Sequence, residues 1–125
     1  MYQVHLIDRF IDDDEIPGIF AGNGMAVLPY TFFYGQSGAL AHAMEYGLPV
    51  VASDVGGLGE SVRKWKVGRC VAPDDPKALA EGIRMAAEPA EYWSAKAAIE
   101  KIRDKLKWKH TAEITWDAYR SVLNI

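Results

Sequence analysis

The chain has 125 residues, half of them hydrophobic and a quarter charged, which is typical of a single globular domain and excludes a disordered chain. Its one cysteine, Cys70, excludes an intramolecular disulfide, and no apolar run approaches the roughly 20 residues of a membrane span. The first ten residues lack the basic start and apolar centre of a signal peptide. We therefore expect one domain over residues 1–125, cytoplasmic, with no stable membrane insertion and no nucleic-acid partner.

The net charge of −3 conceals an asymmetry along the chain. Residues 1–62 carry eight acidic residues and one basic residue, Arg9, whereas residues 63–125 carry thirteen basic and nine acidic residues. An anion site in the first half would therefore have almost no cations of its own. Backbone amides at a helix N-terminus are the remaining source of positive potential there.

Four short apolar segments are predicted to be buried strands, and helices are predicted between and after them. The strands are expected over residues 4–7, 25–28, 48–52 and 69–72. The helices are expected over residues 15–21, from Ser37 to just before Gly47, over residues 60–65, from Asp75 and Pro76 onward, over residues 92–106, and from about residue 111 to 123. Apolar strands alternating with helices predict an α/β fold: a partial Rossmann-like parallel sheet of about four strands, flanked by helices and followed by a helical C-terminal tail.

Two loops at the carboxyl ends of the predicted strands are candidates for a ligand site. In the first, the small residues Ser37, Gly38 and Ala39 would let a ligand reach the exposed amides of a helix N-terminus, which favours phosphate. In the second, over residues 54–59, Gly56 and Gly57 would allow close backbone approach. The same glycines can instead serve the turn alone.

Other polar residues have simpler interpretations. Glu60 could accept from the hydroxyl groups of a sugar, but an acid in the first turn of a helix is also favoured by the helix dipole. The three histidines lack metal-ligand spacing, and Cys70 within a strand is typical of a small buried apolar residue. The basic run over residues 101–109 is interpreted as a solvated helix face, with contact to anionic lipid as the alternative.

The order of the motifs is more specific than any one of them. The segments LPY, QSGAL, EYGLPVVASDVGGLGESV and VGRCVAPDDPKALAEGI follow one another, and Trp108 and Tyr119 close the chain. In this order they resemble the C-terminal, donor-binding domain of group 1 (family 4) retaining glycosyltransferases of the GT-B architecture. The resemblance covers essentially the whole chain and implies a domain truncated at its N-terminal side.

The resemblance implies a donor site and no resident cofactor or metal. A UDP- or GDP-sugar donor would meet Ser37, Gly38, Ala39 and Leu40 with its diphosphate and sugar, and Gly56, Gly57 and Glu60 would lie beside it. Many members of the family carry two glutamates eight residues apart, at positions that are Tyr34 and His42 here. The QSGAL form resembles a subgroup that lacks this pair.

Members of the family add an Arg and a Lys from strands that would precede residue 1, so we expect weak donor binding, no catalytic residue and no sugar transfer by this chain. Without those strands, the strand over residues 25–28 would expose an unpaired apolar edge. We expect a homodimer through that edge or through the last helix, at Trp116 and Tyr119. A non-catalytic module that binds a nucleotide or a protein, and a fragment resembling a sugar-nucleotide 2-epimerase, remain alternatives to a glycosyltransferase.

Overall fold

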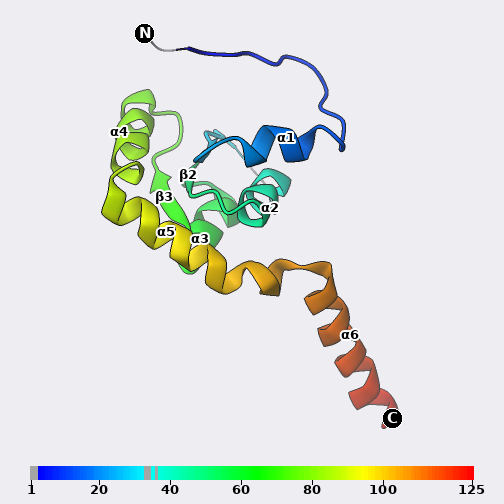
Figure 1. Cartoon of the computed structure of the whole chain (residues 1–125). Helices are drawn as coiled ribbons and strands as arrows, with labels where there is room; N and C mark the ends of the chain where they lie inside the picture. Colours follow the sequence, from blue (N-terminus) through cyan, green and yellow to red (C-terminus); the bar gives the residue numbers. More distant parts are fainter. Residues whose placement is uncertain (1–2, 33–34, 36) are drawn as a thin grey trace.

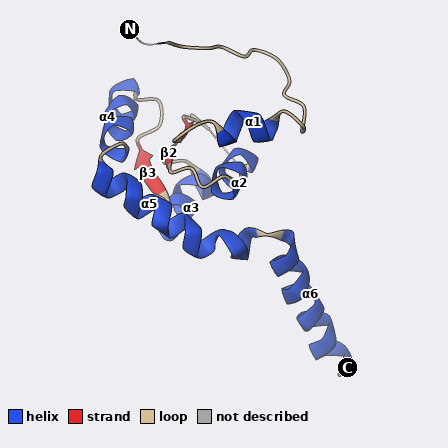
Figure 2. Ribbon diagram, in the orientation of Figure 1, coloured by secondary structure: helices blue, strands red, loops and turns tan. Residues whose placement is uncertain are grey.

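A computed structural model describes residues 3–32, 35 and 37–125 of the chain. Its centre is a parallel sheet of three strands in the order β1-β2-β3, formed by Ala26–Leu28, Val50–Ser53 and Gly68–Val71 (Figures 1 and 2). The register sets Val27 beside Val51 and Val51 beside Arg69. All four residues of β2 are buried, as expected for the middle strand of a sheet covered on both faces.

Helices surround this sheet in the order predicted for an α/β fold. They are α1 (Ile16–Ala21), α2 (Gly38–Glu45), α3 (Gly56–Trp65), α4 (Pro76–Ala86), α5 (Pro89–Ile102), the 3₁₀ helix η1 (Arg103–Leu106) and α6 (Trp108–Leu123). The core lies between one sheet face and helices α2, α3 and α5, where Met44, Val50, Leu58 and Ile99 are fully buried. On the other face, α4 packs through Gly82 against Val51 and Val71. The predicted fold class is confirmed.

Helix α5 holds the amino ends of the strands through side chains that donate to backbone carbonyls. The Tyr92 hydroxyl donates to the Gly24 carbonyl at 3.0 Å, just before β1, and the Lys96 ammonium donates to the Gly47 carbonyl at 3.1 Å, just before β2. The Arg103 guanidinium then donates to the Glu45 carbonyl in the last turn of α2, where a cation is favoured by the helix dipole. At the opposite edge of the sheet, where the strands end, loops lead from each strand into the next helix.

The strand predicted over residues 4–7 is wrong. These residues form an exposed extended arm beside the body of the domain, with Val4 88% and Leu6 86% exposed (Figure 1). An apolar segment becomes a strand only where a neighbouring strand offers hydrogen bonds, and none of the described residues pairs with this one. The sheet therefore has three strands instead of about four, with β1 at one edge, as expected.

Two helix boundaries also differ from the prediction. The loop predicted over residues 54–59 is mostly helix, because α3 begins at Gly56 and buries Leu58 and Val62 one turn apart. The helix predicted over residues 92–106 begins earlier, at Pro89, and changes to the 3₁₀ helix η1 after Ile102.

Candidate functional site

Each strand is followed by a helix whose N-terminus lies at the carboxyl edge of the sheet. At α2, the buried Ser37 hydroxyl accepts from the Leu40 amide at 3.1 Å, which confirms the predicted cap. At α4, the Asp75 carboxylate accepts from the Ala78 amide at 3.0 Å. Helix α3 differs, because Val55 occupies its N-cap position and provides no side-chain hydrogen bond.

The N-cap residue of α3 therefore leaves the first amides of the helix without a side-chain cap. The first hydrogen bond within α3 runs from the Gly59 amide to the Val55 carbonyl at 3.3 Å, so the amides of Gly56, Gly57 and Leu58 precede it. Gly56 has φ = 47°, a left-handed conformation that glycine adopts without strain. Amides that precede the first hydrogen bond of a helix, at the positive end of its dipole, favour an anion.

The loop before α2 lies against this helix start. A β-carbon built on Gly57 would lie 3.1 Å from the Gly35 carbonyl oxygen, so only a glycine at position 57 fits here without displacement of its neighbour. A cavity of about 290 Å³ lies between α2 and α3, and Ser37, Leu40 and Gly57 all line it. The structure thus brings together three of the seven predicted site residues from two separate loops.

The other four predicted residues do not line this cavity. Gly38 lines a second, neighbouring pocket, and Ala39 is half-buried against the core. Gly56 is exposed at the start of α3. Glu60 is exposed one turn further along α3 and lines neither pocket. The expectation that Glu60 occupies the first turn of its helix is wrong, because α3 begins four residues earlier than predicted.

A glycine that the sequence analysis did not select has a packing role. Gly59 is buried against Asp54, and a β-carbon on Gly59 would lie 3.1 Å from the Asp54 Cα. The Gly59 carbonyl accepts from the Cys70 thiol at 3.5 Å, and partial burial raises the pKa of that thiol. Nearby, the Arg63 guanidinium lies 2.5 Å from the Asp54 carboxylate, which raises the pKa of Arg63. Arg63 is therefore already paired at the carboxyl end of β2.

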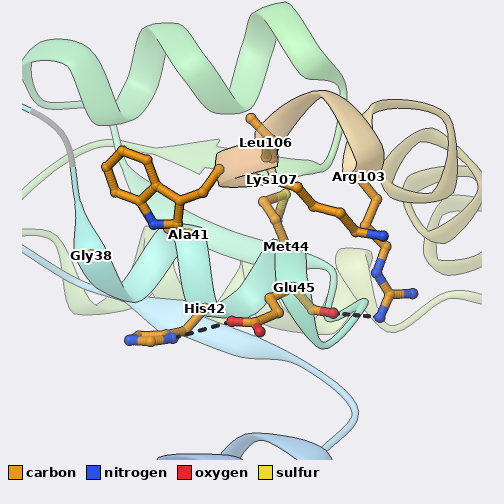
Figure 3. Close-up of a pocket in the computed structure, with 9 residues that line it drawn as sticks. Gly38, Ala41, His42, Met44, Glu45, Arg103, Leu106 and Lys107 are labelled. Atoms are coloured by element: carbon orange, nitrogen blue, oxygen red, sulfur yellow. Dashed lines mark hydrogen bonds and ion pairs between the residues drawn. The ribbon is translucent and has the colours of Figure 1, made fainter. Parts of the chain in front are cut away.

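The second pocket has a volume of about 630 Å³ and lies between α2 and η1 (Figure 3). Its lining combines small, apolar and charged residues from segments that are far apart in sequence: Gly38, Ala41, His42, Met44, Glu45, Arg103, Leu106, Lys107 and Trp108. Two cations, Arg103 and Lys107, stand at this pocket, each with an acidic neighbour on its own segment: Glu100 at 3.1 Å and Asp104 at 2.9 Å. The first half of the chain has almost no cations of its own, and these two cations come to α2 from the second half of the chain.

His42 and Tyr34 occupy the positions where many group 1 enzymes carry glutamates. The His42 ring lies 5.5 Å from the ring of Phe20 in α1, and its Nδ1 lies 3.7 Å from the Glu45 carboxylate. Tyr34 lies outside the described residues. His42 therefore packs against an aromatic ring and an acid on its own helix, rather than into the cavity beside Gly57.

Residues 3–32, 35 and 37–125 contain no group of three or more His, Cys, Asp or Glu side chains that could hold a metal ion. In the same ranges, every helix is too short or too polar to cross a membrane.

A parallel sheet with helix N-termini gathered at its carboxyl edge is the arrangement of open α/β domains, in which ligands bind outside that edge. The model of a protein family described as "Glycosyl transferases group 1" matches residues 2–88 of this chain. These residues include both loops and all seven predicted site residues. The chain therefore belongs to the group 1 glycosyltransferase family, and the resemblance found in its sequence is confirmed.

Individual relatives agree with this assignment. The chain is 38% identical to a D-inositol 3-phosphate glycosyltransferase of Nocardioides sp. over 98 residues, which cover 77% of this chain and 21% of the relative. It is 31% identical to a glycogen synthase of Mycobacterium tuberculosis over 112 residues, covering 87% of this chain and 27% of the relative. The solved structure of a sucrose-phosphate synthase from Thermosynechococcus elongatus aligns with a TM-score of 0.73 and 28% identity, covering 91% of this chain and 29% of that one. The chain thus spans less than a third of each of these proteins.

Proposed function

We propose that this chain is the donor-binding part of a nucleotide-sugar-dependent glycosyltransferase, with the donor diphosphate held between the N-termini of α2 and α3. The observation that carries the proposal is the uncapped N-terminus of α3 beside the cavity lined by Ser37, Leu40 and Gly57. The amides of Gly56 and Gly57 precede the first hydrogen bond within α3, and the amides of Gly38 and Ala39 precede the first hydrogen bond within α2, from Ala41 to Ser37.

Electrostatics predict that this binding is weak in the chain alone. Each helix N-terminus offers roughly half a positive charge against the two or so negative charges of a diphosphate. Arg63, the basic side chain of α3 at this edge, is already paired with Asp54. Arg103 and Lys107 belong to the neighbouring pocket and also have acidic neighbours.

The sugar of the donor would lie toward Glu60, whose exposed carboxylate can accept hydrogen bonds from hydroxyl groups. The donor is a substrate, so the proposal includes no resident cofactor and no metal. It also includes no catalytic residue. The names of the relatives mention different compounds, namely D-inositol 3-phosphate, glycogen and sucrose phosphate, so they support a reaction class and not one acceptor.

A second candidate is a binding module without transfer activity. His42, which pairs with Glu45 and Phe20, favours it, because an imidazole cannot replace the carboxylate that many group 1 enzymes carry at this position. For location, we propose the cytoplasm, where the unpaired Cys70 would stay reduced.

Calorimetric titration of UDP, GDP and their common sugar derivatives into the chain tests both candidates. We expect millimolar binding of one nucleotide series, weakened several-fold by Glu60→Ala for the sugar derivative but not for the free nucleotide. Glu113→Ala, an exposed glutamate on α6, is the matched control and should change neither. Transfer of the sugar to an acceptor, in addition to binding of the donor, would exclude the non-catalytic module. The absence of any binding at millimolar nucleotide would contradict the donor site.

A further inference from the structure

A cavity between α3 and α5 lies apart from the site proposed for the donor. It has a volume of about 330 Å³ and is formed by the end of α3 and the later turns of α5, two helices that contact each other (Figure 1). Its lining combines an indole, two ammonium groups, a hydroxyl and small apolar side chains, and includes Trp65, Lys66, Ser94, Ala97, Ala98 and Lys101. None of the described residues that line it is acidic.

The two lysines of this cavity have no counter-charge. Neither Lys66 nor Lys101 makes an ion pair or a side-chain hydrogen bond with any described residue. The acids closest to Lys101 in sequence, Glu100 and Asp104, pair with other basic side chains. Two ammonium groups around one cavity without a carboxylate favour an anion there.

Two further lysines extend this positive charge beyond the cavity. Lys64 and Lys105 stand two residues before Lys66 and four after Lys101, and both are exposed and form no ion pair within the described part of the chain. We call Lys64, Lys66, Lys101 and Lys105 the basic patch. Its helices cover one face of the sheet, whereas Lys77, also exposed, belongs to α4 on the other face.

The backbone of Lys66 indicates that its ammonium group has a use. Lys66 follows the last residue of α3 with φ = 56°, a left-handed conformation for which glycine is the usual residue at a helix end. A lysine in this conformation has a steric cost that glycine does not have. The helix dipole favours cations at this end, but Arg63 and Lys64 already provide them in the last turn of α3. The dipole alone therefore does not account for Lys66.

We propose that the basic patch docks this chain on an anionic phospholipid bilayer, with a lipid phosphate between Lys66 and Lys101. The ammonium groups bind the phosphate as point charges, and the Ser94 hydroxyl can donate to one of its oxygens. The half-buried Trp65 provides an amphipathic indole, the group that proteins place at the level of lipid headgroups. The bilayer is bound at its surface and is not crossed.

A bilayer accounts for the patch better than a soluble anion or a nucleic acid does. The patch continues past the cavity to Lys64 and Lys105, further than one small anion reaches, whereas a bilayer presents many phosphates in one plane. A long nucleic acid would also meet residues 1–62, which carry eight acids and one base, whereas a planar surface meets one side of the molecule. Each lysine near an anionic leaflet raises affinity about fivefold.

Docking through this patch leaves the donor site free. Helix α3 has ten residues and is therefore about 15 Å long. Gly57 lies at its start, at the carboxyl edge of the sheet, and Lys66 follows its end. The two sites thus lie at opposite ends of one helix, and nucleotide binding should not change when the chain is on a bilayer.

Co-sedimentation with vesicles tests the proposal, with pure phosphatidylcholine compared with phosphatidylcholine that contains about one third phosphatidylglycerol. We expect binding only to the vesicles with phosphatidylglycerol, and its loss at high salt, because salt screens surface charges. Lys66→Gly should weaken binding about fivefold, and Lys66→Gly combined with Lys101→Ala about 25-fold. Lys77→Ala removes an exposed lysine from the other side of the sheet and should leave binding unchanged.

Lys66→Gly also separates docking from folding. Because glycine relieves the left-handed strain at position 66, this variant should unfold at the same or a higher urea concentration than the wild type, although it binds vesicles less well. Equal binding to both kinds of vesicle, or equal losses in Lys77→Ala and in the double variant, would overturn the proposal. So would release of the chain from vesicles by millimolar glycerol 1-phosphate, which would assign the cavity to a soluble anion, or tighter binding to single-stranded RNA than to the vesicles.

Discussion

Gly57, in the first turn of α3, lies directly against the backbone of Gly35 in the loop that leads to α2. A β-carbon at position 57 would lie 3.1 Å from the Gly35 carbonyl oxygen, closer than side chains normally approach a backbone. This contact joins the two loops at the carboxyl edge of the sheet. It also fixes how far the N-termini of α2 and α3 stand apart, and this separation determines whether both can contact one diphosphate.

Substitution of Gly57 by Val is therefore expected to act on binding more than on folding. The side chain would push the Gly35 loop away from α3 and widen the gap between the two helix starts. We expect a several-fold loss of affinity for the nucleotide that the wild-type chain binds, measured by calorimetry. The free energy of unfolding should change by less than about 1 kcal/mol, because Gly57 lies at the rim of the domain and the loss of glycine favours the helix.

The control for Gly57→Val is Gly38→Ala, since no described atom lies within 4 Å of a β-carbon at Gly38. If Gly38→Ala leaves affinity unchanged, the loss in Gly57→Val comes from displacement of the loop. Equal losses in both variants would instead mean that any β-carbon near the diphosphate obstructs it, and unchanged affinity in both would remove the α2–α3 junction from the donor site.

The packing of α4 gives a stability prediction. A β-carbon at Gly82 would overlap the Val71 side chain and lie 3.4 Å from the Val51 Cγ1 atom. Gly82→Ala must therefore lift α4 from the sheet, and overpacking of this kind costs about 1–3 kcal/mol of unfolding free energy. Urea unfolding followed by circular dichroism, at a fixed protein concentration, measures the change.

Gly18→Ala is the matched comparison for Gly82→Ala. Gly18 lies within helix α1, and nothing described lies within 4 Å of its β-carbon position, so alanine there gains helix propensity without a clash. We expect Gly18→Ala to be neutral or stabilising by up to about 1 kcal/mol. A Gly82→Ala variant as stable as the wild type would show that α4 can shift without loss of packing.

Local signals in the sequence were sufficient for most of the elements. The Ser37 and Asp75 caps begin their helices as predicted, and Gly47 has φ = 72° after the end of α2. Each of these features depends on residues within about one helical turn of each other, so a short stretch of sequence is enough to predict it. The same holds for β2, whose continuous apolar run is buried on both faces.

The errors concern features that depend on distant parts of the chain. Residues 4–7 have an apolar pattern, but a strand needs a neighbouring strand, which no local pattern can specify. The pocket cations were missed because Arg103 reaches α2 across 58 residues of sequence, and its position depends on the path of α5 across the domain. The start of α3 was misplaced because three glycines suggested a loop, whereas the burial of Leu58 and Val62 sustains a helix.

An ion pair whose titration can be measured lies between the extended arm and α1. The Arg9 guanidinium makes two bonds to the Glu15 carboxylate, at 2.6 and 2.9 Å, and the Asp12 amide donates to the same carboxylate at 3.0 Å. The bond to Arg9, followed by that from the Asp12 amide, lowers the pKa of Glu15 from 4.5 to about 2. The pair ties the arm to the start of α1, since Glu15 is the N-cap residue of that helix.

A pKa lowered on folding means that this contact stabilises the folded arm above pH 4.5, the ordinary value, and is lost as pH falls toward about 2. We expect the side-chain carboxyl signal of Glu15 in NMR spectra to stay at its ionised position between pH 6 and 3. In Arg9→Met the midpoint should return toward 4.5, because the larger of the two hydrogen-bond contributions is gone while the Asp12 amide remains. In Glu15→Gln, trypsin should cleave after Arg9 faster than in the wild type, because the guanidinium no longer has a carboxylate partner. A wild-type midpoint near 4.5, or equal cleavage rates, would mean that the arm moves independently of α1 in solution.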